Sequence, residues 1–427
     1  MTTTKDRKFG GLFRDPSFRN LWVGQTAAMF GSRVVAVTVP LIAALTLNAS
    51  LFEMGLITAL ESLPYLFISL FAGVWLDRGS KRLILVATDV VRAGLLLLIP
   101  LAWWQDLLSI PLLMGVVLLV GCCSVVSDIG GMSMLPEVVE RTHLVEANSK
   151  LELSSSASSL SGSAIGGAIL QVVSAPVAMV VNAATYLLSA VFTALVRTRP
   201  GAVKDQEAPS KGVWREIGEG ITFITRNPTI RVLVVATMIF NFFTLALEPV
   251  FLVFITRTLD LEPIHIGLIM SSSGAGALVG ALIAERFGRR LGLGPALVTS
   301  LGTAGLVSVL LPLATVVPTF PAVVLVIVMH FVDAAMVIVC NVNLRSYRTA
   351  ITPDELQGRM NASNRMLVMG AAPVGAVFGG ALGGWTGVTV ALVVVSVGIL
   401  CSAAVIFFSR VRSVREIPQD AELEAAA

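Results

Sequence analysis

Apolar stretches of about twenty residues follow one another along most of this chain, separated by short polar or turn-forming clusters. About twenty apolar residues are what an α-helix needs to cross a hydrocarbon core about 30 Å thick. The pattern therefore predicts an all-α polytopic membrane protein. Its twelve predicted transmembrane helices cover residues 21–47, 51–76, 83–104, 110–135, 147–173, 176–196, 230–255, 264–287, 294–315, 320–344, 360–382 and 388–408.

A long polar stretch, RTRPGAVKDQEAPSKGVWREIGEG, separates the sixth and seventh predicted helices. The halves on either side of it repeat, because NSKLELSSSASSLSGSAIGGAIL aligns without a gap with NASNRMLVMGAAPVGAVFGGALG. We predict two pseudo-symmetric six-helix bundles with a substrate path at their interface. The predicted parts are an N-terminal segment 1–20, a first bundle 21–197, a central loop 198–228, a second bundle 229–410 and a tail 411–427.

Lysine and arginine concentrate in alternate connections between the predicted helices. They precede the first helix and follow every even-numbered one, whereas the connections on the other side carry none apart from Arg257. Under the positive-inside rule, both termini and the central loop are expected to be cytoplasmic. The first twenty residues show no cleavage site for a signal peptide, so we expect the first helix to be retained.

Composition excludes an ordinary soluble protein and gives no sign of catalysis. The chain is 55% hydrophobic and 13% charged, whereas about a quarter of the residues are charged in soluble domains. It contains no HExxH, GxSxG or phosphate-loop motif, and its four cysteines lack metal-site spacing. We expect no enzymatic activity, no metal and no cofactor, so that an ion or substrate gradient, most simply of protons, supplies the energy.

A charged motif, GVWLDRGSKR, follows the second predicted helix, and a shorter copy, AERFGRR, follows the eighth. With the segments DPSFRNLWVGQ, RNPTIRVL and ITPDELQGRMNASNR, this repeated motif resembles the major facilitator superfamily. Within it the chain is similar to the efflux branch that exports drugs and siderophores, such as macrolides and enterobactin. The resemblance covers nearly the whole chain and implies the major facilitator fold in a bacterial cytoplasmic membrane.

The resemblance implies that the two charged motifs form a cytoplasmic gate latch, used once in each half. The alternative is that they only anchor the topology at the anionic membrane surface. Ser80 stands where the family has glycine, so we expect the first loop to turn less sharply than the second. The gating residues predicted are Gly73, Asp77, Arg78, Lys81, Arg82, Glu285, Arg286, Gly288, Arg289 and Arg290.

Ionisable side chains within the apolar helices are functional candidates, because each costs about 2.5–3.5 kcal/mol on insertion scales. A carboxylate at membrane depth can carry a proton from one side to the other, neutralise a nearby arginine or bind a cationic substrate. Asp89 and Arg92, three residues apart, are instead predicted to form a pair on a helix surface. The candidates for proton coupling or substrate binding are Arg33, Glu61, Asp128, Glu248, Asp333 and, more weakly, His330.

Small residues mark the fifth and eleventh predicted helices. The stretch SGSAIGG resembles the antiporter motif of exporters, Gly-Pro-x-x-Gly-Gly, with Ser163 in place of the proline. The resemblance implies proton antiport, and the glycines by themselves indicate close helix packing. The residues predicted to pack helices together are Gly162, Gly166, Gly167, Gly375, Gly379 and Gly380.

The leading hypothesis is a secondary active transporter that exports amphipathic or lipophilic small molecules by alternating access, coupled to proton entry. A facilitator or importer of a small metabolite is the alternative, although few Asn, Gln or Tyr residues lie in the helices to line a polar pocket. A membrane-embedded enzyme or a non-transporting sensor is a remote alternative. The expected partners are a small-molecule substrate and the lipid bilayer, with no nucleic acid, and the protein is expected to be a monomer.

Overall fold

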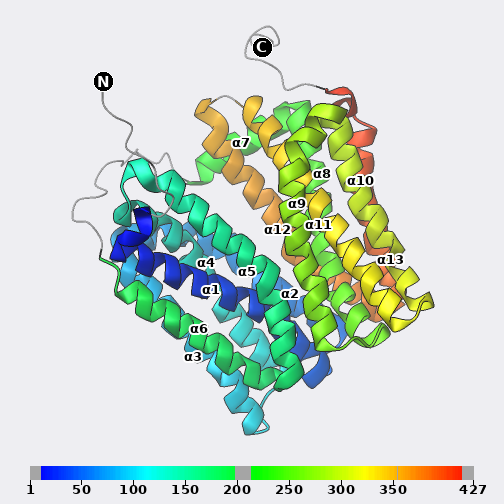
Figure 1. Ribbon diagram of the computed structural model, residues 1–427. Helices are drawn as coiled ribbons and strands as arrows, with labels where there is room; N and C mark the ends of the chain where they lie inside the picture. The colour runs from blue at the N-terminus through cyan, green and yellow to red at the C-terminus, as the bar shows by residue number, and fades with distance from the viewer. Residues whose placement is uncertain (1–10, 198–212, 353, 416–427) are drawn as a thin grey trace, which may run out of the picture. The chain divides into compact units, whose positions relative to one another are not determined.

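The computed structural model describes residues 11–197, 213–352 and 354–415 (Figure 1). These residues form helices and no strands. Contacts divide the chain into two compact units, Met1–Val39 with Phe67–Gln206, and Pro40–Leu66 with Glu207–Ala427. The second unit thus includes a segment, Pro40–Leu66, that comes from the first half of the sequence. The bundle boundaries at residues 21–197 and 229–410 stay a prediction.

The first unit contains most of the helices of the first half. They are α1 (Pro16–Leu41) up to Val39, the end of α2 (Leu51–Arg78) from Phe67, α3 (Lys81–Trp104), α4 (Ile110–Val138), α5 (Leu144–Val172) and α6 (Ala175–Ala194). Helix α3 packs against α4 and α6. An apolar cluster with Phe18, Leu21, Leu85 and Met134 joins the start of α1 to α3 and α4.

The second unit contains the later helices. They are α7 (Val213–Arg226), α8 (Pro228–Val253), α9 (Pro263–Leu291), α10 (Leu293–Leu310), α11 (Thr319–Ala350), α12 (Asp354–Thr386) and α13 (Val388–Phe407). The most extensive helix pairs are α9 with α11 and α8 with α12. A core that includes Ile230, Leu297, Leu344 and Ile399 joins α8, α10, α11 and α13.

The two halves begin their first long helix in the same way. Asp15 and Asn227 each precede a proline, and proline suits the first helical position because its missing N–H would have no partner there. The Asp15 Oδ1 accepts a hydrogen bond from the Ser17 N–H at 2.8 Å. The Asn227 Oδ1 accepts bonds from the N–H groups of Thr229 and Ile230 at 3.0 and 3.1 Å. Each cap satisfies backbone donors that the helix leaves free.

The same two helices also end alike. Helix α1 continues into a π-helical turn, η2 (Ile42–Thr46), and α8 continues into η4 (Phe254–Thr258). Each turn is followed by a residue with positive φ, Asn48 at 51° and Asp260 at 49°. Asn and Asp tolerate this left-handed conformation better than other non-glycine residues. The repeat predicted from the sequence therefore extends to the detailed geometry of the helix ends.

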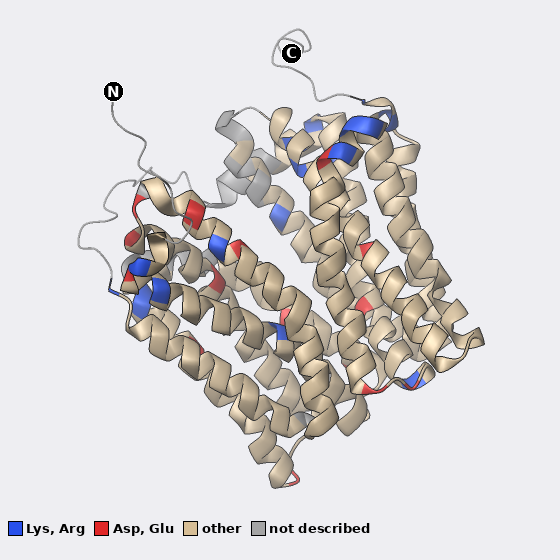
Figure 2. Cartoon of the chain, in the orientation of Figure 1, with Lys and Arg blue, Asp and Glu red and all other residues tan. Residues whose placement is uncertain are grey.

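Eleven helices of the described residues are long and apolar enough to cross a membrane. The predicted fifth span is the exception, because α5 has 29 residues but is rich in serine and carries Glu146, Lys150 and Glu152. Lysine, arginine, aspartate and glutamate gather near the ends of the helices (Figure 2). Large apolar side chains such as Trp104, Phe320 and Trp385 are exposed, as expected for surfaces that face lipid.

Helix α7 has no counterpart among the predicted elements, because residues 213–226 lie in the predicted central loop 198–228. Its apolar residues recur at positions 213, 217, 221 and 224 among charged ones, which is the spacing of an amphipathic helix. It packs against α12 and α8. The stretch is too short and too polar to span a membrane, so a search for spans alone misses it.

Candidate functional site

Two carboxylates of the second unit lie at similar depth in their helices, Glu61 on α2 and Glu248 on α8. Glu61 stands ten residues after the start of α2, and Glu248 stands ten residues before the end of η4. At 1.5 Å per residue, Glu61 lies about 15 Å from the start of α2, and Glu248 lies about 15 Å from the end of η4. Glu61 lies within electrostatic range of Glu248. Both side chains are exposed, and in the described part of the chain neither makes a hydrogen bond or an ion pair.

A second pair of candidates lies on α11. His330 stacks on Phe251 of α8, with ring centroids 5.4 Å apart and an interplanar angle of 14°. Asp333 is one helical turn further along α11, half-buried, and no described residue hydrogen-bonds to it. Phe251 is three residues after Glu248, so both lie on one side of α8. Four of the ionisable candidates thus lie on three helices of the second unit, α2, α8 and α11.

The first unit holds the other two candidates, Arg33 of α1 and Asp128 of α4, and both side chains are exposed. The stem of Arg33 packs against α5 at Gly162, where an added Cβ would lie 2.7 Å from the Arg33 Cβ. Asp128 lies within electrostatic range of Arg92. The Asp128 charge therefore acts on the buried guanidinium of Arg92 in the same unit.

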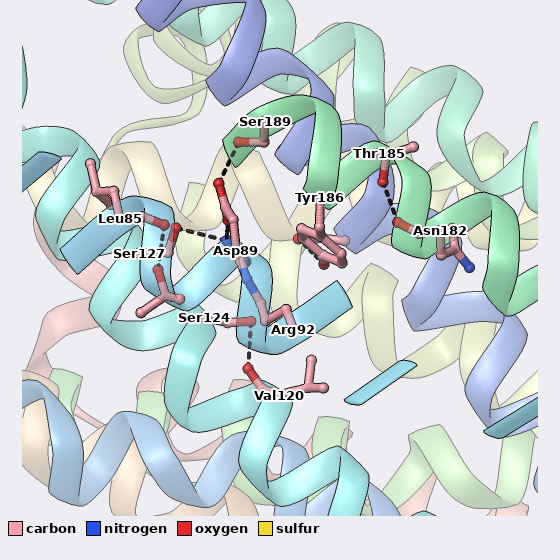
Figure 3. A network of polar contacts seen from close by, with 12 residues as sticks. Leu85, Asp89, Arg92, Val120, Ser124, Ser127, Asn182, Thr185, Tyr186 and Ser189 are labelled. Carbon is pink, nitrogen blue, oxygen red and sulfur yellow. Dashed lines mark hydrogen bonds and ion pairs between the residues drawn. The ribbon is translucent and has the colours of Figure 1, made fainter. Parts of the chain in front are cut away.

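Asp89 and Arg92 form an ion pair, but it is buried rather than on the helix surface, so the predicted placement is wrong (Figure 3). Arg92 also donates to the Ser127 hydroxyl of α4 at 2.8 Å, and the Ser189 hydroxyl of α6 donates to Asp89 at 2.6 Å. The signal was present in the sequence, because both residues lie on the stripe of α3 that carries Leu85, Leu96 and Ile99. The spacing of three residues predicted the pair but not that it lies on the buried face of α3.

Tyr186 of α6 completes this network, and the sequence analysis missed it. The Arg92 guanidinium lies over the Tyr186 ring, 4.3 Å from its centroid, and the Tyr186 hydroxyl is 3.0 Å from the Ser32 hydroxyl of α1. One network thus joins α1, α3, α4 and α6. Removing one partner of a buried pair costs about 3–5 kcal/mol, which suits a fixed frame better than a site that exchanges ligands.

The first charged motif is bonded to the ends of neighbouring helices. Lys81 forms an ion pair with Glu137 at 2.8 Å and donates to the Ser133 carbonyl at 3.2 Å, both near the end of α4. Arg82 donates to the carbonyl of Val196, just after α6, at 3.1 Å. Cations are favourable at such helix ends because the last carbonyls have no partner. The surroundings of Gly73 and the side chains of Asp77 and Arg78 lie outside the described residues.

The second motif lies within the last turns of α9, which runs to Leu291 and not to residue 287 as predicted. Glu285 and Arg289 pair at 3.5 Å with both side chains largely exposed. The remaining basic residues, Arg286 and Arg290, are also exposed. Gly288 faces α11, because a Cβ there would overlap the side-chain oxygen of Asn343.

The glycines of α5 and α12 lie at close helix contacts. A Cβ on Gly166 would meet Val34 of α1 at 3.4 Å, and Gly167, one residue on, is buried. On α12, a Cβ on Gly375 or Gly379 would overlap backbone carbonyl oxygens of α8, and one on Gly380 would lie 2.6 Å from the Leu51 carbonyl oxygen of α2. The contacts of α12 leave room only for glycine and let the backbones approach closely, whereas Gly166 would accept a Cβ in ordinary contact with Val34.

Comparison with known proteins finds similarity over nearly the whole chain. A family model described as a transmembrane secretion effector matches residues 11–425. The multidrug efflux pump Tap of Mycolicibacterium fortuitum is 24% identical over 425 residues, which cover 96% of this chain and 98% of Tap. Tap of Mycobacterium tuberculosis (strain ATCC 25618 / H37Rv) is 25% identical over 414 residues, which cover 95% of each chain.

Solved transporters share the fold at low sequence identity. A bacterial homolog of the human lysosomal transporter Spinster, inward-facing and unoccupied, has a TM-score of 0.71 at 14% identity and covers 97% of this chain and 100% of its own. The nucleoside transporter NupG has a TM-score of 0.70 at 14% identity, covering 92% and 99%. These likenesses show the fold alone and say nothing of the substrate.

Proposed function

Because the chain belongs to the transmembrane secretion effector family of the major facilitator superfamily, we propose that it exports amphipathic or lipophilic small molecules by alternating access in exchange for protons. It is a multi-pass membrane transporter and not an enzyme. The relatives named as multidrug efflux pumps support a drug-like or natural-product substrate. The proposal includes no cofactor beyond the proton gradient, and it places both termini in the cytoplasm.

The observation that carries this proposal is the pair of Glu61 and Glu248. Two like charges repel strongly where little water screens them, and one proton or one cationic group relieves the repulsion. No lysine or arginine among the described residues pairs with either carboxylate. A proton and a cationic substrate would therefore compete for the same two groups, which is the exclusion that antiport requires.

The surroundings of Glu248 suit a site that changes during transport. Pro249 follows it directly in α8 and cannot donate a backbone hydrogen bond, so the helix can bend there. Phe242 and Phe243 of α8 cluster with Phe378 of α12, with ring centroids 5.0–6.2 Å apart. An aromatic cluster on the same helix as a carboxylate would accept a substrate with an apolar body and a positive group.

The test is transport by the purified protein in liposomes. Internal pH is followed with a dye while lipophilic cations and neutral drugs are offered one at a time. We expect cations to drive proton movement, and Glu61→Gln and Glu248→Gln each to reduce it at least about tenfold, because a glutamine can neither take up a proton nor pair with a cation. Asp106→Asn is the matched control, because Asp106 lies in the α3–α4 connection with a φ of 56° that asparagine also tolerates.

The same measurement separates exchange from the alternative. Substrate that moves only down its own gradient, with no proton movement in the unaltered protein, would contradict antiport and favour a facilitator of a metabolite. Proton movement that survives in both glutamine variants would show that another group, with Asp333 first among the candidates, couples transport to protons.

A further inference from the structure

Arg257 is the exception to the distribution of basic residues, and the structure gives it a specific contact. It lies in η4, at the position that Leu45 occupies in the equivalent turn η2. The Arg257 Nη2 donates hydrogen bonds to the carbonyl of Ala44 at 3.0 Å and to that of Ala49 at 2.7 Å. The Arg257 guanidinium thus joins the turn η4 to the turn η2 and the connection that follows it.

The first acceptor suits a cation through its place at a helix end. Ala44 lies in the last turn of the α1 and η2 helix, where backbone carbonyls lack helical partners and carry the negative end of the helix dipole, whereas Ala49 lies in the short connection before α2. Hydrogen bonds from a charged donor are shorter and stronger than those between neutral groups. The contact therefore joins the segment Pro40–Leu66 to α8 by charge as well as by geometry.

A second contact closes the same segment onto α12. A Cβ on Gly55 of α2 would lie 2.6 Å from the carbonyl oxygen of Ala376 and 3.0 Å from the Cα of Gly380. The two helices thus touch backbone to backbone at a point that only glycine allows. This contact lies four residues beyond the start of α2, close to the turn to which Arg257 bonds.

Prolines stand at the two places where the chain leaves this segment. Pro40 lies in α1 at the boundary after Val39, and Pro64 lies in α2 two residues before the boundary at Leu66. Proline lacks the backbone N–H and weakens the helix at its own position, so bends concentrate there. The segment between them can move while the rest of α1 and α2 keeps its place in the first unit.

We propose that Arg257 is the latch of a gate formed by the segment Pro40–Leu66, on the membrane face opposite the basic loops. In the closed state Arg257 and the Gly55–Gly380 contact hold this segment against η4 and α12 of the same unit. During the transport cycle both contacts break, and the segment bends away at Pro40 and Pro64. The latch rests on the proposed function, because only an alternating-access carrier needs such a gate.

Pulsed electron paramagnetic resonance tests the latch without any substrate. Spin labels replace Phe52 and Val316, both exposed, in a protein whose four cysteines have been removed and which is placed in lipid nanodiscs. We expect Arg257→Gln to raise the ratio of long to short label distances at least about tenfold, as loss of charged hydrogen bonds implies. Gly55→Ala should raise it too, through the independent contact with α12.

Two matched variants should leave the distances unchanged. Arg231→Gln removes the same charge from an exposed site at the other end of α8, and Gly94→Ala adds a methyl group where no atom lies within 4 Å. Wild-type distances in both Arg257→Gln and Gly55→Ala would overturn the latch, and a change in Gly55→Ala alone would overturn the role of Arg257. Failure of transport in liposomes would contradict the proposed function and leave these distances interpretable.

Discussion

In the first unit, Lys81 and Arg82 open α3 and bond to the ends of α4 and α6, whereas in the second unit Arg289 and Arg290 close α9 and stay exposed. The two pairs align in the sequence. The difference arises because α2 ends at Arg78, while α9 continues to Leu291 before Gly292 turns the chain with a φ of 83°. A shift of a few residues in a helix end thus gives the same residues different neighbours.

The second unit closes its turn by other means. The N–H of Gly294 donates to the carbonyl of Val414 at 2.8 Å, and that of Leu293 donates to Arg415 at 3.3 Å. The chain after α13 therefore bonds to the start of α10 through its backbone, where the chain after α6 is bonded to α3 by Arg82. A charged side chain in one unit and backbone hydrogen bonds in the other thus fix the chain after the last helix of the unit to an earlier helix.

The largest expected effect is at the glycine that permits this backbone contact. Gly294→Ala would place a Cβ onto the carbonyl of Val411, so we expect a loss of about 3 kcal/mol in the free energy of unfolding in detergent. Gly79→Ala in the first motif is the matched variant, because its Cβ would meet the flexible end of Ile84 at 2.8 Å and the Trp75 carbonyl oxygen only at 3.2 Å. Equal losses in the two variants would contradict the contrast between the units.

The next comparison exchanges serine and glycine between the aligned positions Ser80 and Gly288. Gly288→Ser should cost about 2 kcal/mol, because the new side chain displaces Asn343, which donates to the carbonyls of Ala284 and Val339. Ser80→Gly should change stability by only about a few tenths of a kcal/mol, because the Ser80 side chain makes no cap bond. Thermal unfolding of both variants measures the difference, and a costly Ser80→Gly would show that serine has a role in the first turn.

The smallest expected effect concerns the ion pairs. A double-mutant cycle on Lys81 and Glu137 should give a coupling of about 1 kcal/mol, because both side chains are mostly buried. The cycle on Glu285 and Arg289 should give about 0.3 kcal/mol, since both are exposed and screened by water. Raising the salt concentration should reduce the second coupling more than the first. A second coupling as large as the first would contradict their different burial.

Much of the fold could be predicted from local patterns. The spans followed from the length of apolar runs, and the caps at Asp15 and Asn227 follow from the residues before Pro16 and Pro228. Helix α5 shows the limit, because its serines lower its hydropathy although it is as long as the spans around it. Helix α7 was not predicted because its 14 residues are too few and too polar to span a membrane, and apolar runs indicate only spans.

The candidate site was predictable residue by residue but not as an arrangement. Glu61 and Glu248 were visible as charges in apolar helices, and Arg257 was visible as an exception to the positive-inside rule. Their relations were not visible, because Glu61 lies 187 positions before Glu248 and Ala44 lies 213 before Arg257. The Asp89–Arg92 pair was found for the opposite reason, since its members are neighbours on one helix.

The sequence by itself determined that this protein crosses the membrane many times, that its halves repeat and that it carries a few costly charges within its helices. These are local properties, set by the length of apolar runs and by the residues at helix ends. Only the tertiary structure decided that the segment Pro40–Leu66 packs with the second unit, and that the two aligned motifs are held differently. The physical reason is that contacts between distant segments depend on where each helix ends and which face it turns inward, and small shifts in either change every neighbour.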